Sequence, residues 1–237
     1  MQPGRRPSSR DSIHLVTTGG LLISFEGIDG CGKTTQLRRL ADRLRAAGHE
    51  PLLVREPGGT ALGERVREIL LDPATGDIAA AAEALLYAAS RAELVAGTIE
   101  PALAAGQVVV VDRYVDSSLA YQGAGRELGI DRVLEANLLA TRGRLPDVTV
   151  LVEVDPQVAS ERRRAAGDDD DRLEQAGSEF FERVHVAYGK LAARWPERIR
   201  RVDGERAVDE VERAVDAIVA PLLVARGIEL EPLEQLT

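Results

Sequence analysis

The sequence predicts an α/β protein in which a five-stranded parallel sheet lies between two layers of helices. Short apolar runs alternate with longer segments of helical period, a pattern typical of a parallel sheet covered on both faces. A glycine-rich loop, within FEGIDGCGKTTQ at residues 25–36, stands between the first apolar run and the first helical segment. With 237 residues and 44% hydrophobic content, the chain can bury the core of one such domain.

The apolar runs set the expected strands. Five are predicted, at residues 21–26, 51–54, 108–112, 149–154 and 198–202. The first two are separated by a helix, because Leu37, Leu40, Ala41 and Leu44 repeat at helical spacing and Gly48 follows as a stop signal.

Further helices are expected in the later connections and after the last strand. They are predicted at 83–97, 131–142, from Pro156 onward, from Ser178 to Trp195, and along Val208, Val211, Val215, Ile218 and Leu222. Asp155 can cap the helix that begins at Pro156, because a carboxylate accepts hydrogen bonds from free amides and proline suits the first helical position. Pro196 ends the helix that is expected from Ser178 to Trp195.

The ends of the chain differ from its centre. Residues 1–20 have neither an apolar segment nor a periodic apolar face, so we expect a disordered tail. The domain is predicted over 21–224, with a C-terminal tail at 225–237, no inter-domain linker, and an excursion at the Gly-Asp run 167–171.

Composition excludes several classes of partner. The net charge of −9 argues against a binder of nucleic-acid polymers, which normally carries a basic surplus. No apolar stretch approaches the roughly 20 residues of a membrane span. The single cysteine, Cys31, rules out an intramolecular disulfide and a multi-cysteine zinc site, so a reducing cytoplasm fits best.

The glycine-rich loop matches a known phosphate-binding spacing. Gly27, Gly32, Lys33 and Thr34 fit G-x-x-x-x-G-K-[ST], after a predicted strand and before a predicted helix. Glycines let backbone amides turn inward and form an anion cradle at the helix start, where Lys33 can reach the β- and γ-phosphates and Thr34 can ligate Mg²⁺. The predicted nucleotide-binding residues are Gly27, Ile28, Asp29, Gly30, Cys31, Gly32, Lys33, Thr34 and Thr35.

Other interpretations of this loop are weaker. A bare glycine turn does not require Lys-Thr at this offset. Cys31 as a nucleophile lacks a nearby histidine, and the loop uses its position for the backbone. Motors, GTPases and small-molecule kinases share such loops, but an Asn-Lys-x-Asp element typical of GTP recognition is absent.

Four more stretches decide between these classes. They are REPGGT at 55–60, YAASR at 87–91, DRYVDSSLAYQ at 112–122 and DRLE at 171–174. With the phosphate loop, in this order, they resemble bacterial thymidylate kinases over about residues 20–223. The resemblance implies a P-loop kinase fold, Mg²⁺-dependent transfer of the ATP γ-phosphoryl group to thymidine monophosphate (dTMP) giving dTDP and ADP, a place in dTTP synthesis, and a homodimer.

Asp112 and Arg113 end a buried strand, so both side chains should emerge at the carboxyl edge of the sheet, beside the phosphate loop. Asp112 can hold a magnesium-bound water, and Arg113 can bridge the acceptor phosphate and the transferring group. The alternative is an acidic-basic pair that only ends the strand. In the family, the residue matching Asp29 approaches Mg²⁺ and the acceptor phosphate; a turn-forming aspartate is the alternative.

Tyr87 and Arg91 are four residues apart on a predicted helix, so they share a face. The family places an aromatic ring on the thymine plane and an arginine at its edge, with phenylalanine usual where this chain has Tyr87. Core packing by Tyr87 with Arg91 on the surface is the alternative.

The remaining acceptor contacts come from the match. Ser118, Tyr121 and Gln122 would border the base and sugar, with Tyr121 rejecting a 2′-hydroxyl. Glu56 would lie near the sugar and phosphate, and Arg67 would add a phosphate contact unless either is ordinary surface charge.

Phosphoryl transfer also needs a cation beside the equatorial oxygens. In one class of the family that arginine lies in the phosphate loop, at the position where this chain has Gly30. The resemblance therefore implies the other class, in which the arginine comes from a lid, here about residues 161–175. We expect Arg164 to act with Lys33, Asp29 and Arg113 as the catalytic set.

The identity of that lid arginine has competitors. Arg162 and Arg172 are the alternatives to Arg164, and Arg162 or Arg163 could be a solvated helix charge. The acidic run 168–171 lacks the spacing of a calcium loop and is expected to be solvated. Asp203 to Arg206 follow the last strand, where related kinases hold adenine.

Two rival functions stay open. The chain could phosphorylate another deoxynucleotide or nucleoside, which a panel of acceptors would reveal. It could also be a nucleotide-binding regulatory protein that has lost transfer activity, which would bind ATP without acceptor-dependent turnover.

Overall fold

The computed structural model describes residues 19–167, 172–173 and 177–233. The tail expected over residues 1–18 and the acidic run 168–171 lie outside the described residues. Among the described helices, none combines the length and the apolar character that crossing a bilayer requires.

The five predicted strands are confirmed as one parallel sheet. They are β1 (Leu21–Glu26), β2 (Leu52–Arg55), β3 (Val108–Asp112), β4 (Val148–Glu153) and β5 (Ile199–Asp203). Their order is β2-β3-β1-β4-β5, so β1 lies in the centre with β3 and β4 beside it. Three of the expected strands differ from the observed bounds by one residue.

Burial explains why these segments are strands. Every residue of β1 is buried, and β3 and β4 are buried except at their last residue. A strand covered on both faces has no polar side to show, so β-branched residues run without alternation, as in Val108 to Val111. The edge strand β5 exposes three of its five residues.

The helices follow the strands as the periodicity predicts, with additions. They are α1 (Lys33–Ala46), α2 (Ala61–Leu71), α3 (Ala80–Leu94), α4 (Glu100–Ala104), α5 (Val115–Ser118), α6 (Ile130–Ala140), α7 (Pro156–Ala166), α8 (Ser178–Arg194) and α9 (Val208–Val224), with π-helical turns at Val95–Ile99 and Leu119–Gly125 and a 3₁₀ turn at Pro73–Thr75. The expected cap on α7 is confirmed, since Asp155 Oδ1 accepts from the Gln157 amide at 2.8 Å.

Three helical segments were not anticipated from the sequence, namely α2, the short α4, and the segment from Val115 to Gly125. The buried face of α2 holds only Gly63, Val66 and Leu70, which is too few large apolar residues for a clear periodic signal. The segment from Val115 to Gly125 is buried nearly all round, so it has no amphipathic stripe. Only in the segment from Val115 to Gly125 does burial, rather than periodicity, accompany the helix.

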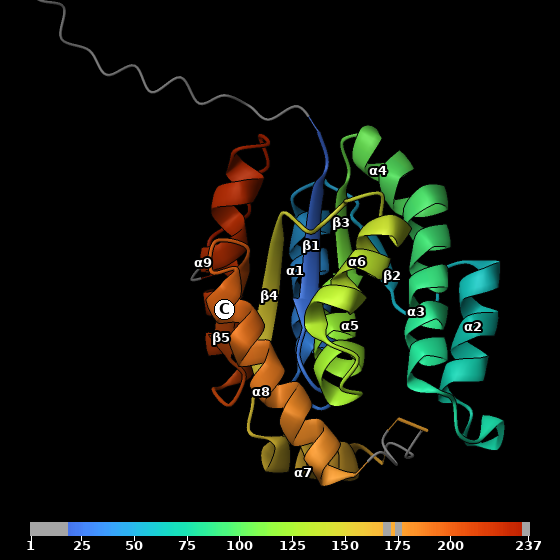
Figure 1. The fold of residues 1–237 in the computed structure, drawn as a ribbon. Helices are drawn as coiled ribbons and strands as arrows, with labels where there is room; N and C mark the ends of the chain where they lie inside the picture. The colour runs from blue at the N-terminus through green and yellow to red at the C-terminus, as the bar shows by residue number, and fades with distance from the viewer. Residues whose placement is uncertain (1–18, 168–171, 174–176, 234–237) are drawn as a thin grey trace, which may run out of the picture.

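The helices cover the two faces of the sheet. Figure 1 shows α5, α6 and α8 in front of the sheet and α1 behind it. Behind the sheet, α1 and α9 are joined by ion pairs from Arg39 to Glu212 and from Arg43 to Asp216. All strands run toward the same edge, the lower one in Figure 1, where α7 lies.

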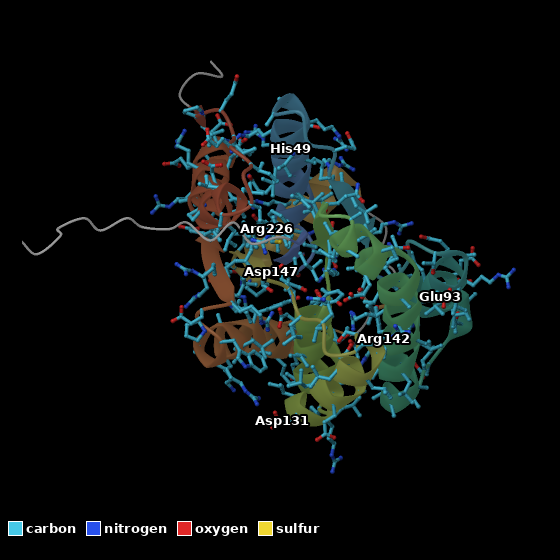
Figure 2. The ribbon with its side chains drawn as sticks, turned by 90° about the horizontal axis from the view of Figure 1, so that it is seen from above. His49, Glu93, Asp131, Arg142, Asp147 and Arg226 are labelled. Carbon is cyan, nitrogen blue, oxygen red and sulfur yellow. The ribbon has the colours of Figure 1, made fainter. Side chains whose placement is uncertain are left out.

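Packing continues beyond α9. Arg226 donates to the Gly20 carbonyl at 3.3 Å and to Asp147, whose other oxygen accepts from the Leu22 amide at 2.8 Å. Figure 2 shows Arg226 and Asp147 next to each other. Ile228 is buried in the same core, so the packed part extends past residue 224, the boundary that the sequence suggests.

Candidate active site

A cavity of about 800 Å³ collects most of the predicted site residues. Its walls come from the phosphate loop, the segments after β2, β3 and β5, the middle of α3, and α7. Of the predicted residues, the lining includes Asp29, Gly30, Cys31, Gly32, Lys33, Thr34, Thr35, Glu56, Arg67, Tyr87, Arg91, Arg113, Ser118, Tyr121 and Gln122. Gly27, Ile28, Asp112 and Arg164 do not line it.

The phosphate loop meets the start of α1, which begins at Lys33. Gly32 occupies the N-cap position and has no side chain to satisfy the first amides of the helix. Those amides and the positive end of the helix dipole are therefore available to an anion in the cavity.

Three charged groups lie together at the centre of the cavity. Asp29 Oδ1 accepts from Lys33 Nζ at 2.9 Å and from Arg113 Nη2 at 2.7 Å. Burial would raise the pKa of Asp29, but Arg113 and Lys33 hold it well below its usual range. Burial and Arg113 would lower the pKa of Lys33, yet Asp29 leaves it raised. Asp29 is thus a carboxylate held between two cations.

Arg113 has a strained backbone, with φ of 69° in a non-glycine residue. Its guanidinium donates to the Gly27 carbonyl at 3.0 Å, to Ser117 Oγ at 3.1 Å and to the Tyr121 hydroxyl at 3.3 Å. It also lies over the Tyr121 ring, 5.0 Å from its centroid. These contacts hold the guanidinium between the phosphate loop and the far end of the cavity.

Ser117 brings in a residue that sequence reasoning missed, Glu26. This carboxyl is fully buried at the end of β1 and accepts from the Tyr114 amide at 2.7 Å, Ser117 Oγ at 2.5 Å and the Tyr188 hydroxyl at 3.0 Å. Burial, together with the charge of Asp116, raises its pKa. Its place directly before the glycine-rich loop was the only sequence signal.

Thr34 and Asp112, the two predicted metal ligands, are adjacent. The Thr34 hydroxyl donates to Asp112 Oδ2 at 2.7 Å, although Asp112 itself does not line the cavity. Within the described ranges, no cluster of three or more His, Cys, Asp or Glu is placed to hold a metal. The two oxygens have the chemistry that Mg²⁺ prefers, and in sites of this kind substrate phosphates supply further ligands.

Cys31 is buried, and burial raises the pKa of its thiol. A protonated thiol is a poor nucleophile. The raised pKa argues against a nucleophilic role for Cys31, and the use of this position for its backbone stays a prediction.

Arg91 is not a surface residue, since only 1% of it is exposed. Its Nη1 donates to Ser118 Oγ at 2.9 Å and to Asn137 Oδ1, and its Nη2 donates to the Tyr114 carbonyl at 3.0 Å. Its Nη2 also lies 2.5 Å from Glu56 Oε2. Among the described residues, its Nε is buried without a hydrogen-bond partner.

Asn137 on α6 is a second residue that sequence reasoning missed. It accepts from Arg91 and donates to the Val133 carbonyl at 2.7 Å. The available signal was an asparagine within a predicted helix, but its partner Arg91 lies 46 residues away in the chain.

Glu56 is buried in the cavity wall. Burial raises its pKa to about 7, although Arg91 acts in the opposite direction. The Glu56–Arg91 pair therefore joins the end of β2 to α3 inside the wall.

The remaining predicted acceptor contacts also meet at this end. Tyr87 and Arg67 are half-buried, and Arg67 Nη1 donates to the Pro57 carbonyl at 3.1 Å. Tyr121 is buried and stands edge-on to Phe180, with ring centroids 6.0 Å apart. One wall thus combines aromatic faces with arginines.

The arginines of α7 divide into two groups. Arg162 and Arg163 line the cavity, whereas Arg164 is exposed and does not. An ideal Cβ on Gly30 would lie 3.1 Å from Arg163 Cγ and 2.3 Å from the Ala159 carbonyl oxygen. Arg163 therefore runs along the loop position where a side chain has no room.

The other competitor, Arg172, is buried away from the cavity. Its Nη2 lies 2.6 Å from Glu83 Oε2, and its Nε donates to the Leu70 carbonyl at 2.8 Å. Its neighbour Leu173 does line the cavity.

The end of the cavity next to β5 is lined by Gly204, Arg206, Val208 and Val211. Asp203 and Glu205, from the same predicted stretch, do not line it. The Gly204 carbonyl accepts from Arg162 Nη1 at 2.9 Å, which ties this end to α7.

Comparison with known proteins gives one consistent result. The sequence profile of the family described as Thymidylate kinase matches residues 25–215. A thymidylate kinase of Bifidobacterium longum (strain DJO10A) is 47% identical over 206 residues, covering 86% of this chain and 98% of the relative. A thymidylate kinase of Deinococcus radiodurans is 49% identical over 201 residues, covering 85% and 97%.

A solved structure agrees with these relatives. The crystal structure of thymidylate kinase from Ehrlichia chaffeensis superimposes with a TM-score of 0.69 at 30% identity. The match covers 85% of this chain and 98% of that one.

Proposed function

The chain belongs to the thymidylate kinase family and is a phosphotransferase, and we propose that its cavity binds ATP and dTMP together and transfers the γ-phosphoryl group to dTMP. The products would be dTDP and ADP, on the route to dTTP. The observation that carries the proposal is one continuous cavity with a phosphate loop at one end, an aromatic and arginine-rich wall at the other, and the Asp29, Lys33 and Arg113 cluster between them.

At the donor end, the free amides at the start of α1 and the Lys33 ammonium would hold the polyphosphate. Lys33 is positioned by its 2.9 Å contact with Asp29. Adenine would lie toward Gly204, Val208 and Val211, where apolar side chains offer a surface for a flat ring.

At the acceptor end, the geometry of Arg91 supports pyrimidine recognition. Both terminal nitrogens of its guanidinium are occupied by protein groups, which fixes its orientation. Its buried Nε–H is the remaining donor, and a buried donor left unpaired is costly. A base carbonyl oxygen in the cavity would satisfy it, with Tyr87 providing a ring face beside the base.

Arg113 and Tyr121 would hold the sugar and the acceptor phosphate. The Arg113 guanidinium touches both the phosphate loop and Tyr121, so it spans the gap between the two substrates. Asp29 would orient Arg113 and Lys33 toward the transferring group, since direct in-line transfer depends on positioning and on stabilising developing charge.

Mg²⁺ fits the oxygens of Thr34 and Asp112 and, when bound with ATP, would supply charge neutralisation of the β- and γ-phosphates. Asp112 would orient the Thr34 hydroxyl through their 2.7 Å hydrogen bond.

Arg163, rather than Arg164, is proposed as the lid cation. Its stem passes Gly30, the loop position at which another class of the family carries its arginine. The Arg163 guanidinium, coming from α7, would then supply the positive charge that the loop arginine supplies in the other class.

The proposal includes a homodimer in the cytoplasm. Exposed apolar side chains occur on three helices, of which α3 packs against the other two: Leu62 and Ile69 on α2, Leu85 on α3, and Leu138 and Leu139 on α6. An apolar surface of this kind on adjacent helices suits a second copy of the chain. The chain has a single cysteine, so its fold uses no intramolecular disulfide, which is compatible with a reducing compartment.

A coupled ADP-release assay over a panel of monophosphates tests the function. We expect turnover with ATP and dTMP to exceed turnover with deoxyuridine and deoxycytidine monophosphates. A preference for cytidine nucleotides would overturn the base assignment, and ATP binding without acceptor-dependent turnover would favour a regulatory protein.

A further inference from the structure

Glu83 is a buried carboxylate that the reaction as described does not use. It lies in the first turn of α3 and is 0% exposed. Its Oε1 accepts from Gln122 Nε2 at 3.0 Å and Arg126 Nε at 3.2 Å, and its Oε2 accepts from Arg126 Nη2 at 3.1 Å and Arg172 Nη2 at 2.6 Å. Two guanidinium groups and an amide thus converge on one carboxylate.

This convergence is costly to build. Burying a charge is unfavourable unless it is paired and hydrogen-bonded on all sides. Burial would raise the pKa of Glu83, but its bonds from Arg126, Gln122 and Arg172 lower it. The carboxylate is therefore ionised and fully engaged, which fixes the orientation of its three donors.

The donors come from separate segments of the chain. Gln122 belongs to the π-helical turn after α5, Arg126 follows that turn, and Arg172 follows α7. Two of these donors, Gln122 and Arg172, belong to or adjoin the cavity wall. Gln122 itself is a lining residue of the cavity, and so is Leu173, next to Arg172.

Arg172 reaches a further part of the same wall. Its backbone amide donates to the Leu71 carbonyl at 3.1 Å and its Nε to the Leu70 carbonyl at 2.8 Å, at the end of α2. Leu71 is another lining residue. Glu83 thus holds Gln122, Leu71 and Leu173 in one arrangement, one helical turn from Tyr87 on the same face of α3.

Arg126 extends the arrangement to Tyr121. Its guanidinium lies over the Phe180 ring, 4.7 Å from the centroid, and Phe180 stands edge-on to Tyr121. Among the described residues, none of the four bonds that Glu83 accepts reaches the phosphate loop or the segment after β5. The path through Phe180 and Tyr121 reaches that loop only through a further residue, Arg113.

From this geometry we propose that Glu83 is a positioning residue for the acceptor nucleotide. It acts through Gln122 and through the Arg172–Leu173 pair, and it sets the shape of the acceptor wall without touching substrate. The inference rests on the proposed function, because it takes this end of the cavity to be the acceptor site.

The test is Glu83→Gln, which keeps the size of the side chain but replaces one acceptor oxygen with a donor amide. At least one guanidinium then loses its partner. We expect the KM for dTMP to rise about tenfold, the usual scale for losing a buried hydrogen bond to a charged group. The KM for ATP should stay within about twofold, because none of the four bonds that Glu83 accepts reaches the donor end directly.

A purely structural role predicts a different result. In that case Glu83→Gln would lower the Tm and leave the KM for dTMP unchanged, or raise both KM values together, and either result overturns the proposal. Asp216→Asn is the matched control, since it breaks the Arg43–Asp216 pair between α1 and α9 at 2.5 Å, and neither residue lines the cavity. It should lower stability without changing either KM.

Arg172→Gln keeps the proposal testable if the Glu83 variant fails to fold. We expect the same selective rise in the KM for dTMP, and in the double variant a rise smaller than the product of the two single effects. Fully multiplicative effects would contradict action through one pair. If the wild-type enzyme turns over dTMP and these variants have the wild-type KM for dTMP, only this inference fails. If the wild-type enzyme does not turn over dTMP, the proposed function fails.

Discussion

Two neighbouring arginines on α7 allow a test of the lid cation at the level of single residues. Arg163 lines the cavity beside Gly30, whereas Arg164 is exposed outside it. We expect Arg163→Ala to lower kcat by about 100-fold or more, because an arginine that stabilises transferring phosphoryl charge is worth at least this much. Steady-state kinetics with saturating substrates measure the effect.

Arg164→Ala is the matched control, with the same charge removed from the next position of the same helix. It should change kcat by no more than about twofold, since an exposed charge contributes little. The reverse pattern would restore Arg164 as the cation, as the sequence suggests.

Glu56 gives a prediction for the pH dependence of stability. Burial raises its pKa from 4.5 to about 7 in the folded protein. Between these two values the folded state keeps a proton that the unfolded state has lost, so stability falls as pH rises through this window. Compared with Glu56→Gln, the wild type should lose about 2 to 3 kcal/mol of unfolding free energy between pH 5 and pH 8.

Urea unfolding of both proteins at four pH values between 5 and 8 measures this difference. Arg91 and Glu26, the charged groups that act on Glu56, are both kept in the variant. A difference between the two proteins that does not change with pH would show that Arg91 keeps Glu56 ionised throughout.

At the scale of elements, the crossing of α2 over the segment before it depends on Gly63. An ideal Cβ there would lie 2.7 Å from the Gly58 carbonyl oxygen and 3.0 Å from Ser90 Oγ on α3. Gly63→Ala must therefore push α2 away from its neighbours. We expect a loss of about 1 to 3 kcal/mol in unfolding free energy, the usual cost of overpacking.

Gly189→Ala on α8 serves as the control, because no described residue other than its own helix neighbours comes within 4 Å of the added Cβ. Alanine in a helix interior is favoured over glycine by roughly 0.5–1 kcal/mol, so this variant should be more stable than the wild type. Equal effects of the two substitutions would show that close packing at Gly63 does not hold α2 in place.

At the scale of the whole molecule, the homodimer can be tested on its proposed surface. Leu139 on α6 is 84% exposed, and it is the most exposed of the large apolar residues on α2, α3 and α6. Leu139→Glu places a charge in that surface and should raise the dimer dissociation constant at least about 30-fold, if Leu139 is a central contact. Sedimentation or light scattering at several protein concentrations measures it.

Val224→Glu is the control for this surface. Val224 is 54% exposed at the end of α9, and α9 lies at the opposite edge of the molecule from α2 and α3 (Figure 1). This variant should leave the oligomeric state unchanged. A wild-type chain that is monomeric at all concentrations would contradict the proposed dimer.

The sequence by itself determined the features that depend on local chemistry. Val108 to Val111 could only be a strand buried on both faces, and Gly27 to Thr34 carry the spacing of a phosphate loop, because backbone conformation and amide geometry are set within a few residues. The ordered stretches REPGGT, YAASR and DRYVDSSLAYQ likewise indicated residues that now line one cavity. The assigned roles of these residues remain predictions.

Only the tertiary structure decided which side chains meet across the chain. Glu83 gathers donors that follow it by 39, 43 and 89 residues, and Asn137 holds Arg91 from 46 residues away. The place of Arg163 beside Gly30, with Arg164 in solvent, depends on how α7 packs against the loop. No local pattern encodes these contacts, because the packing of distant segments fixes them. Glu, Gln, Arg and Asn are mostly exposed in proteins, so their presence in the sequence does not indicate that they are buried here.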